Sequence, residues 1–156
     1  FAVGEAELLA DGPDGCILAY GSFAYVALDV RRRVLESSGR MLAVVNARFA
    51  KPLDDRLIAA ELARQPVVFT LEDHALTGGF GSAVLEFART RADLDANRLE
   101  LLALPDRFFD HGQRPEQLAE AGLDLDQLTV RVSARLDAIR PGLRLVARSS
   151  PPAPAS

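Results

Sequence analysis

Short apolar runs alternate with longer amphipathic stretches through most of this chain. Residues 16–20, 41–46, 66–71 and 99–104 are largely apolar, which is typical of strands covered on both faces of a parallel sheet. Between these runs, apolar residues recur at helical spacing in residues 22–37, 54–64 and 82–90. Strands that alternate with helices in this way predict βαβ units with right-handed crossovers.

The two ends of the pattern add further elements. Residues 5–10 are expected to form a short edge strand, and two helices are expected at residues 115–121 and 124–139. We therefore predict an α/β fold of three layers, α/β/α, around a mostly parallel sheet. In this prediction residues 1–146 form the domain, and residues 147–156, rich in Pro, Ser and Ala, form a disordered tail.

Composition places the chain among globular domains and excludes several functions. Its 156 residues are 49% hydrophobic and 26% charged, and the net charge of −4 argues against a nucleic-acid partner. No apolar run approaches the roughly 20 residues that span a bilayer, so no membrane partner is expected. Cys16 is the only cysteine, which excludes an internal disulfide and favours a reducing cytoplasm. Cys16 itself is expected to be a small buried hydrophobe and not a nucleophile.

The first residues of the chain bear on whether it is part of a longer protein. Residue 1 is Phe1, and the only methionine is Met41. We expect the chain to be a piece of a longer protein, with a stand-alone protein as the alternative.

Residues 66–87 join a strand pattern to a helix pattern through Gly78, Gly79 and Gly81. A helix that starts after such a loop offers amide donors and a positive dipole end to an anion, but the segment can equally be a packed turn. Val84 is too bulky for the third position of a dinucleotide fingerprint, and no phosphate-binding Gly-x-x-x-x-Gly-Lys stretch exists. A hydroxyl such as that of Ser82 near a helix start is commonly an N-cap. The candidate anion, effector or interface loop therefore comprises Glu72, His74, Gly78, Gly79, Gly81 and Ser82.

The two histidines, His74 and His111, are the candidates for acid–base chemistry or metal binding. Each has carboxylates nearby in the sequence, namely Glu72 and Asp73 for the first and Asp106 and Asp110 for the second. Because they fall on separate predicted loops, without a paired ligand at helical spacing, structural hydrogen bonds are favoured over catalysis or metal binding. We expect neither a catalytic residue nor a metal site in this chain.

Four segments together resemble one family. They are residues 45–54, Glu72 with residues 78–87, residues 104–112, and residues 121–124. In this order they resemble the C-terminal domain of 1-deoxy-D-xylulose-5-phosphate synthases, over roughly residues 1–140. The Gly-Gly-Phe-Gly helix start is shared with transketolases and with β subunits of 2-oxo-acid dehydrogenases, whereas the loop that carries Asp106, Arg107 and His111 distinguishes the synthases. His74 departs from the pattern, which leaves its role open.

The resemblance implies a transketolase C-terminal-like fold, with a five-stranded sheet that has one antiparallel edge strand. It also implies a transferase that uses thiamine diphosphate and Mg²⁺. Such an enzyme joins pyruvate and glyceraldehyde 3-phosphate to give 1-deoxy-D-xylulose 5-phosphate and CO₂, which feeds the non-mevalonate isoprenoid route and the biosynthesis of thiamine and pyridoxal.

By the same resemblance, the N-terminal and central domains hold both cofactors. This chain would bind no cofactor, would be inactive alone, and would support packing against those domains and homodimerisation. Two alternatives remain: the equivalent domain of a transketolase or of a 2-oxo-acid dehydrogenase β subunit, and a stand-alone domain that binds an anion or a protein partner.

Overall fold

The computed structural model of the chain describes residues 2–108 and 112–139. The strands are β1 (Glu7–Ala10), β2 (Cys16–Ala19), β3 (Ala43–Asn46), β4 (Val68–Ala75) and β5 (Leu99–Leu104). The helices are α1 (Phe23–Ser38), α2 (Asp55–Arg64), α3 (Phe80–Arg89), α4 (Arg114–Ala121) and α5 (Leu125–Ala138), with a 3-10 turn η1 (Ala96–Arg98) before β5. Every element expected from the hydrophobic pattern is present. The proposed domain end at residue 146 and the tail at 147–156 lie outside the described residues.

The strands form one sheet in the order β1-β3-β2-β4-β5. β1 runs antiparallel to β3, and the other neighbouring pairs are parallel. This confirms the α/β fold with a mostly parallel, five-stranded sheet and one antiparallel edge strand.

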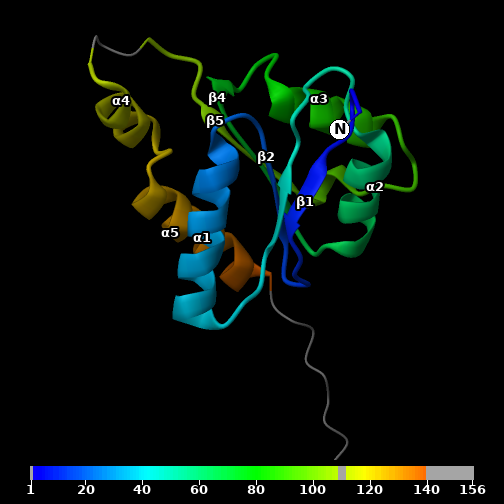
Figure 1. The fold of residues 1–156 in the computed structure, drawn as a ribbon, viewed down its shortest axis with the longest axis horizontal. Coiled ribbons are helices and arrows are strands. Elements are labelled where there is room, and N and C mark those ends of the chain that lie inside the picture. Colours follow the sequence, from blue (N-terminus) through cyan, green and yellow to red (C-terminus); the bar gives the residue numbers. More distant parts are fainter. Residues whose placement is uncertain (1, 109–111, 140–156) are drawn as a thin grey trace, which may run out of the picture.

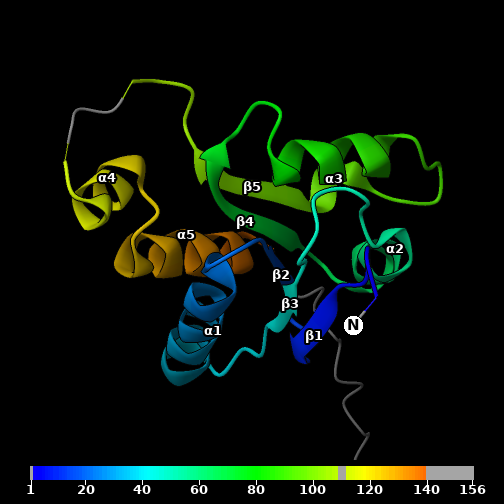
Figure 2. The same cartoon turned by 45° about the horizontal axis from the view of Figure 1, so that its top comes forward.

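The strand order explains why the helices divide between the two faces. From β2 the chain moves through α1 to β3 on one side, and from β3 it moves back through α2 to β4 on the other side of β2. Because both crossovers are right-handed, this change of direction puts α1 and α2 on opposite faces. Figures 1 and 2 show α1, α4 and α5 over one face and α2 and α3 over the other. The direction changes between β2 and β4, so their carboxyl ends mark the switch point of the sheet.

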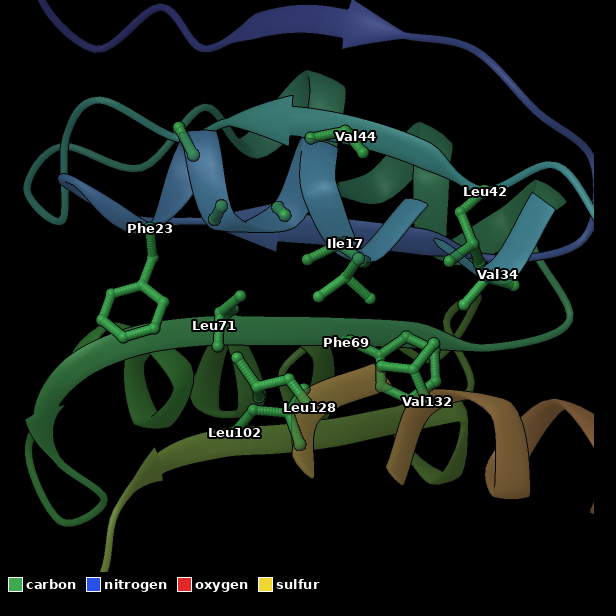
Figure 3. Packing of buried hydrophobic residues seen from close by; sticks show 14 of the residues in the cluster. Ile17, Phe23, Val34, Leu42, Val44, Phe69, Leu71, Leu102, Leu128 and Val132 are labelled. Carbon is green, nitrogen blue, oxygen red and sulfur yellow. The ribbon is translucent and has the colours of Figure 1, made fainter. Parts of the chain in front are cut away.

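Two apolar clusters fill the spaces between the three layers. β2 is buried on both faces, with Ile17 and Ala19 in one cluster and Cys16 and Leu18 in the other. Figure 3 shows part of the first cluster, between the sheet and the helices α1 and α5. Successive side chains of a strand point to opposite faces, so a strand covered on both sides has to be apolar throughout.

β4 is longer than its apolar run predicts. The run was expected to end at residue 71, but the strand continues to Ala75, so Glu72 and His74 lie in a strand and not in a loop. The extension is stabilised by pairing with β5, where Ala75 lies opposite Leu104 and the Leu76 amide donates to the Leu104 carbonyl at 2.9 Å. Because this pairing is made by a distant segment, the polar residues 72–74 gave no local signal for it.

In the described parts of the chain, no helix combines the length and the apolar character that a membrane span requires.

Asp54 connects the edge strand to the helix layer. One carboxylate oxygen accepts from the Leu57 amide at 2.9 Å and caps α2, as expected for an N-cap aspartate. The other accepts from the Ala6 amide at 3.0 Å, just before β1. One side chain therefore fixes both the start of a helix and the approach of the strand.

This double role makes Asp54 more important for stability than a simple cap. We expect Asp54→Ala to lower the free energy of unfolding by about 2–3 kcal/mol, because a cap contributes about 1 kcal/mol and a hydrogen bond to a charged group contributes about 1.5 kcal/mol or more. Asp124→Ala is the matched control, since Asp124 caps α5 through Gln127 alone and should lower it by about 1 kcal/mol. Urea unfolding at neutral pH measures both values, and equal losses would contradict the second role of Asp54.

Candidate functional site

Glu72 lies buried where β4 meets the start of α3. Only 1% of its surface is exposed, and its side chain points toward the first turn of the helix. One carboxylate oxygen accepts from the Phe80 amide and the other from the Gly81 amide, each at 2.7 Å. A helix start exposes unpaired amide donors and a positive dipole end, so a carboxylate is well stabilised there. The anion at this helix start is a side chain of the protein itself.

The glycines around this contact serve different purposes. A Cβ at Gly79 would lie 2.6 Å from a Glu72 carboxylate oxygen, and a Cβ at Gly81 would lie 2.5 Å from the hydroxyl oxygen of Thr70. Gly78 has open space around it, but its φ of +77° is in the left-handed region that favours glycine. Close approach of the helix start to β4 thus requires two of the glycines, and the turn requires the third.

Ser82 is not the N-cap of α3. The helix begins at Phe80 with Gly79 in the cap position, so Ser82 falls inside the first turn. Its hydroxyl donates to the Leu76 carbonyl and accepts from the Gly78 amide at 3.1 Å. Ser82 therefore closes the glycine loop onto the helix, while Glu72, from the strand that precedes the helix, takes the place of the cap.

His74 lies beside a hollow at the switch point of the sheet. Its ring is 60% exposed, and Nδ1 is 3.5 Å from an Asp73 carboxylate oxygen and 4.0 Å from a Glu72 one. The ring centroid is 5.7 Å from that of Tyr20, which stacks on Phe80 at 5.4 Å. The hollow has a volume of about 370 Å³ and also includes Lys51 and the glycine loop in its lining. This is the place where ligands bind in many open α/β sheets.

The groups around the hollow do not fit a diphosphate with its metal ion. Two amides of the helix start are already bound to Glu72, and that carboxylate would repel a phosphate. Within residues 2–108 and 112–139, no cluster of three His, Cys, Asp or Glu side chains could hold a metal ion. His111 lies outside the described residues.

The family-motif loop starts next to the glycine loop. The Leu76 amide donates to the Leu104 carbonyl, and Asp106 and Arg107 follow directly. Arg107 is bound to α4, because its guanidinium donates to the Glu120 carbonyl at 2.9 Å and lies 3.2 Å from the Glu120 carboxylate. The side chain of Arg107 therefore serves an internal contact.

Sequence reasoning missed one polar cluster at the same end of the sheet. Arg114, at the start of α4, pairs with Asp73 of β4 and lies 3.3 Å from the Ser22 hydroxyl. These residues are far apart in the sequence and follow no motif, so no local signal could have indicated the contact.

Removing the Glu72 carboxylate should destabilise the domain strongly. We expect Glu72→Ala to lower the free energy of unfolding by about 3–5 kcal/mol, because two buried amides lose their acceptor. Glu72→Gln keeps one acceptor oxygen but turns an NH₂ group toward the other amide, so a loss of about 2 kcal/mol is expected. Glu86→Gln, at an exposed position of α3, is the control and should change stability by less than about 0.5 kcal/mol. A loss for Glu72→Ala as small as that of the control would contradict the assigned contact.

Cys16 should be chemically silent in the folded domain. Its side chain is fully buried, and burial together with the nearby Glu61 carboxylate raises the pKa of the thiol well above its ordinary value. Little thiolate is then present at pH 8, so a thiol-specific reagent should react only as the protein unfolds. Labelling followed across a urea series tests this, with rapid labelling of the native protein as the contradicting result.

Comparison with known proteins agrees with the resemblance drawn from the motifs. The chain is 49% identical over 110 residues to the 1-deoxy-D-xylulose-5-phosphate synthase of Halothermothrix orenii, covering 70% of this chain and 17% of that protein. It is 38% identical over 136 residues to 1-deoxy-D-xylulose-5-phosphate synthase 1 of Geobacter sulfurreducens, covering 87% of this chain and 21% of the relative. The chain thus spans about a fifth of the length of these curated relatives.

Solved structures share the fold. A split-gene transketolase, whose structure is described as an inactive "beta4 tetramer" of subunits, superimposes with a TM-score of 0.78 at 27% identity. The match covers 90% of this chain and 45% of the other. A transketolase variant from Pichia stipitis superimposes with a TM-score of 0.60 at 21% identity, covering 89% of this chain and 19% of the other, which supports the fold alone. The family described as transketolase, C-terminal domain, matches residues 4–128. The chain therefore belongs to the transketolase C-terminal domain family.

Proposed function

We propose that this chain is the C-terminal domain of a 1-deoxy-D-xylulose-5-phosphate synthase. The observation that carries the proposal is the difference in identity among its relatives. Eight synthases are 38–49% identical over 70–88% of the chain, whereas six transketolase structures are 17–27% identical. A transketolase origin, the first alternative, is less well supported by these values.

In this proposal the reaction belongs to the whole polypeptide. The N-terminal and central domains bind thiamine diphosphate and Mg²⁺, and the bound cofactor supplies the carbanion chemistry that joins pyruvate to glyceraldehyde 3-phosphate with loss of CO₂. The product, 1-deoxy-D-xylulose 5-phosphate, serves isoprenoid, thiamine and pyridoxal synthesis. We place the enzyme in the cytoplasm as a homodimer, with residues 1–146 as its C-terminal domain.

The contribution of this chain is structural. Glu72 with the glycine loop holds α3 against β4, and Arg107 holds the family-motif loop against α4. We assign the glycine loop to packing and to an interface, and not to an anionic effector, because the two helix-start amides already bind Glu72. The open hollow beside His74 is what would favour the stand-alone binding domain, the remaining alternative.

The test compares this chain with the full-length protein. We expect the full-length protein, supplied with thiamine diphosphate and Mg²⁺, to convert pyruvate and glyceraldehyde 3-phosphate into 1-deoxy-D-xylulose 5-phosphate. The 156-residue chain should form no product and should give no heat of binding with the cofactor and Mg²⁺ in calorimetric titration. Micromolar cofactor binding by the chain would refute its structural role, and a full-length protein that transfers two-carbon units between sugar phosphates instead would favour the transketolase alternative.

A further inference from the structure

The carboxyl edge of the sheet exposes large apolar side chains. We define this edge by the segments that follow β2, β3, β4 and β5 and by the residues before β1, which runs antiparallel and so starts at the same end. Val3 is 76% exposed, Tyr25 in the first turn of α1 is 79% exposed, and Phe108 after β5 is fully exposed. Leu76, between β4 and α3, is 40% exposed. Exposed aromatic and aliphatic side chains gathered at one end of a domain indicate an interaction surface.

The opposite, amino edge is closed by polar contacts within the chain. Arg64 at the end of α2 donates to Asp11 at 2.6 Å and to the buried Glu61 at 2.9 Å. Met41 is 44% exposed there, about as much as Leu76 at the carboxyl edge, so the difference between the two edges lies in the more exposed side chains of Val3, Tyr25 and Phe108. Among the described residues, the large apolar side chains that are more than 70% exposed therefore lie at the carboxyl edge and are absent from the amino edge.

The edge strand β1 is a weaker candidate for a contact surface. It is four residues long, its register with β3 shifts between Leu8 and Ala10, and Glu7 pairs with Arg48 beside it. Short, irregular and charged edge strands are features that oppose pairing with another strand.

The surface of the carboxyl edge has two hollows into which side chains of a partner surface could insert. The first is the hollow of about 370 Å³ beside Tyr20, Lys51 and His74. The second, of about 230 Å³, is lined by the paired side chains of Asp73 and Arg114 and by Leu104 and Leu118. Apolar side chains around concave, partly polar hollows are typical of protein contact surfaces.

The N-terminal segment reaches the domain at this same edge. Gly4 packs against Pro52 in the loop after β3, with 2.8 Å between the position of a Cβ and the proline ring. Figures 1 and 2 show this segment next to that loop. The matched segment is about a fifth of the length of each curated relative, and in our proposal a preceding domain would be attached where the apolar side chains are exposed.

We propose that the carboxyl edge of the sheet is the surface that docks against the preceding domains of the same polypeptide. This inference rests on the proposed function for the presence of those domains. The occupant is an apolar surface of the preceding domains that covers Tyr25 and Phe108 and enters the hollow beside His74. Aromatic side chains bury about 150–250 Å² each, so these two would contribute a large share of the contact area.

Hydrogen exchange tests the docking surface directly. Amide exchange is measured in the full-length protein and in the 156-residue chain, and the two are compared segment by segment. Segments 20–26, 74–80 and 104–108 should exchange about tenfold more slowly in the full-length protein, because a docked surface opens less often. Segments 11–15 and 39–42 of the amino edge should exchange at the same rate in both. Slower exchange at the amino edge or at β1, without protection of the carboxyl edge, would overturn the inference.

Matched substitutions provide the second measurement. Tyr25→Asp and Phe108→Asp should each remove the protection of the carboxyl edge in the full-length protein while leaving the thermal unfolding of the 156-residue chain unchanged. Val130→Asp is the control, since Val130 is 67% exposed on α5, in the middle of a helix and away from that edge. Equal effects of all three substitutions on the protection would overturn the inference.

The outcomes separate the inference from the proposed function. If the full-length protein makes 1-deoxy-D-xylulose 5-phosphate but its carboxyl edge is not protected from exchange, the proposed docking surface is refuted and the proposed function is retained. Protection of that edge in a protein that makes no such product supports the surface and refutes the function. A coding sequence that contains no further domain refutes both.

Discussion

The contact on which this end of the domain depends is the buried carboxylate of Glu72 against the first amides of α3. A buried charge without partners is very unfavourable, so the helix start has to come within hydrogen-bond distance of β4. That distance leaves no room for a Cβ at Gly79 or Gly81. The glycine-rich sequence is thus the consequence of a carboxylate that caps a helix from a neighbouring strand.

This contact also gives the glycine-rich family motif a structural role. A free helix start after a glycine loop would be suited to a phosphate group. Here its amides are bound by Glu72, and the groups around the adjacent hollow do not form a metal site among the described residues. The glycine-rich motif is required for the packing of α3 against β4. In our proposal, other domains of the same polypeptide carry out the thiamine-dependent reaction.

The hydrophobic pattern predicted the elements well because each strand and helix carries its own periodic signal. β2 is apolar throughout and is covered on both faces, and α2 and α5 begin next to Asp54 and Asp124, where helices were expected to start. The prediction was wrong where a distant segment decides the local structure. β4 continues through polar residues because β5 pairs with it. The cap was also assigned wrongly, because Glu72 at the end of the preceding strand, and not Ser82, binds the first amides of α3.

The sequence by itself determined the α/β class, the order of its elements and the family, because apolar periodicity and a set of motifs are properties of local stretches of chain. The tertiary structure alone decided which groups meet: Glu72 with the start of α3, Arg114 with Asp73, and the apolar side chains that share the carboxyl edge. The first contact depends on how closely α3 packs back onto β4, whereas the others join residues far apart in the sequence, which only the strand order and the direction of each crossover bring together.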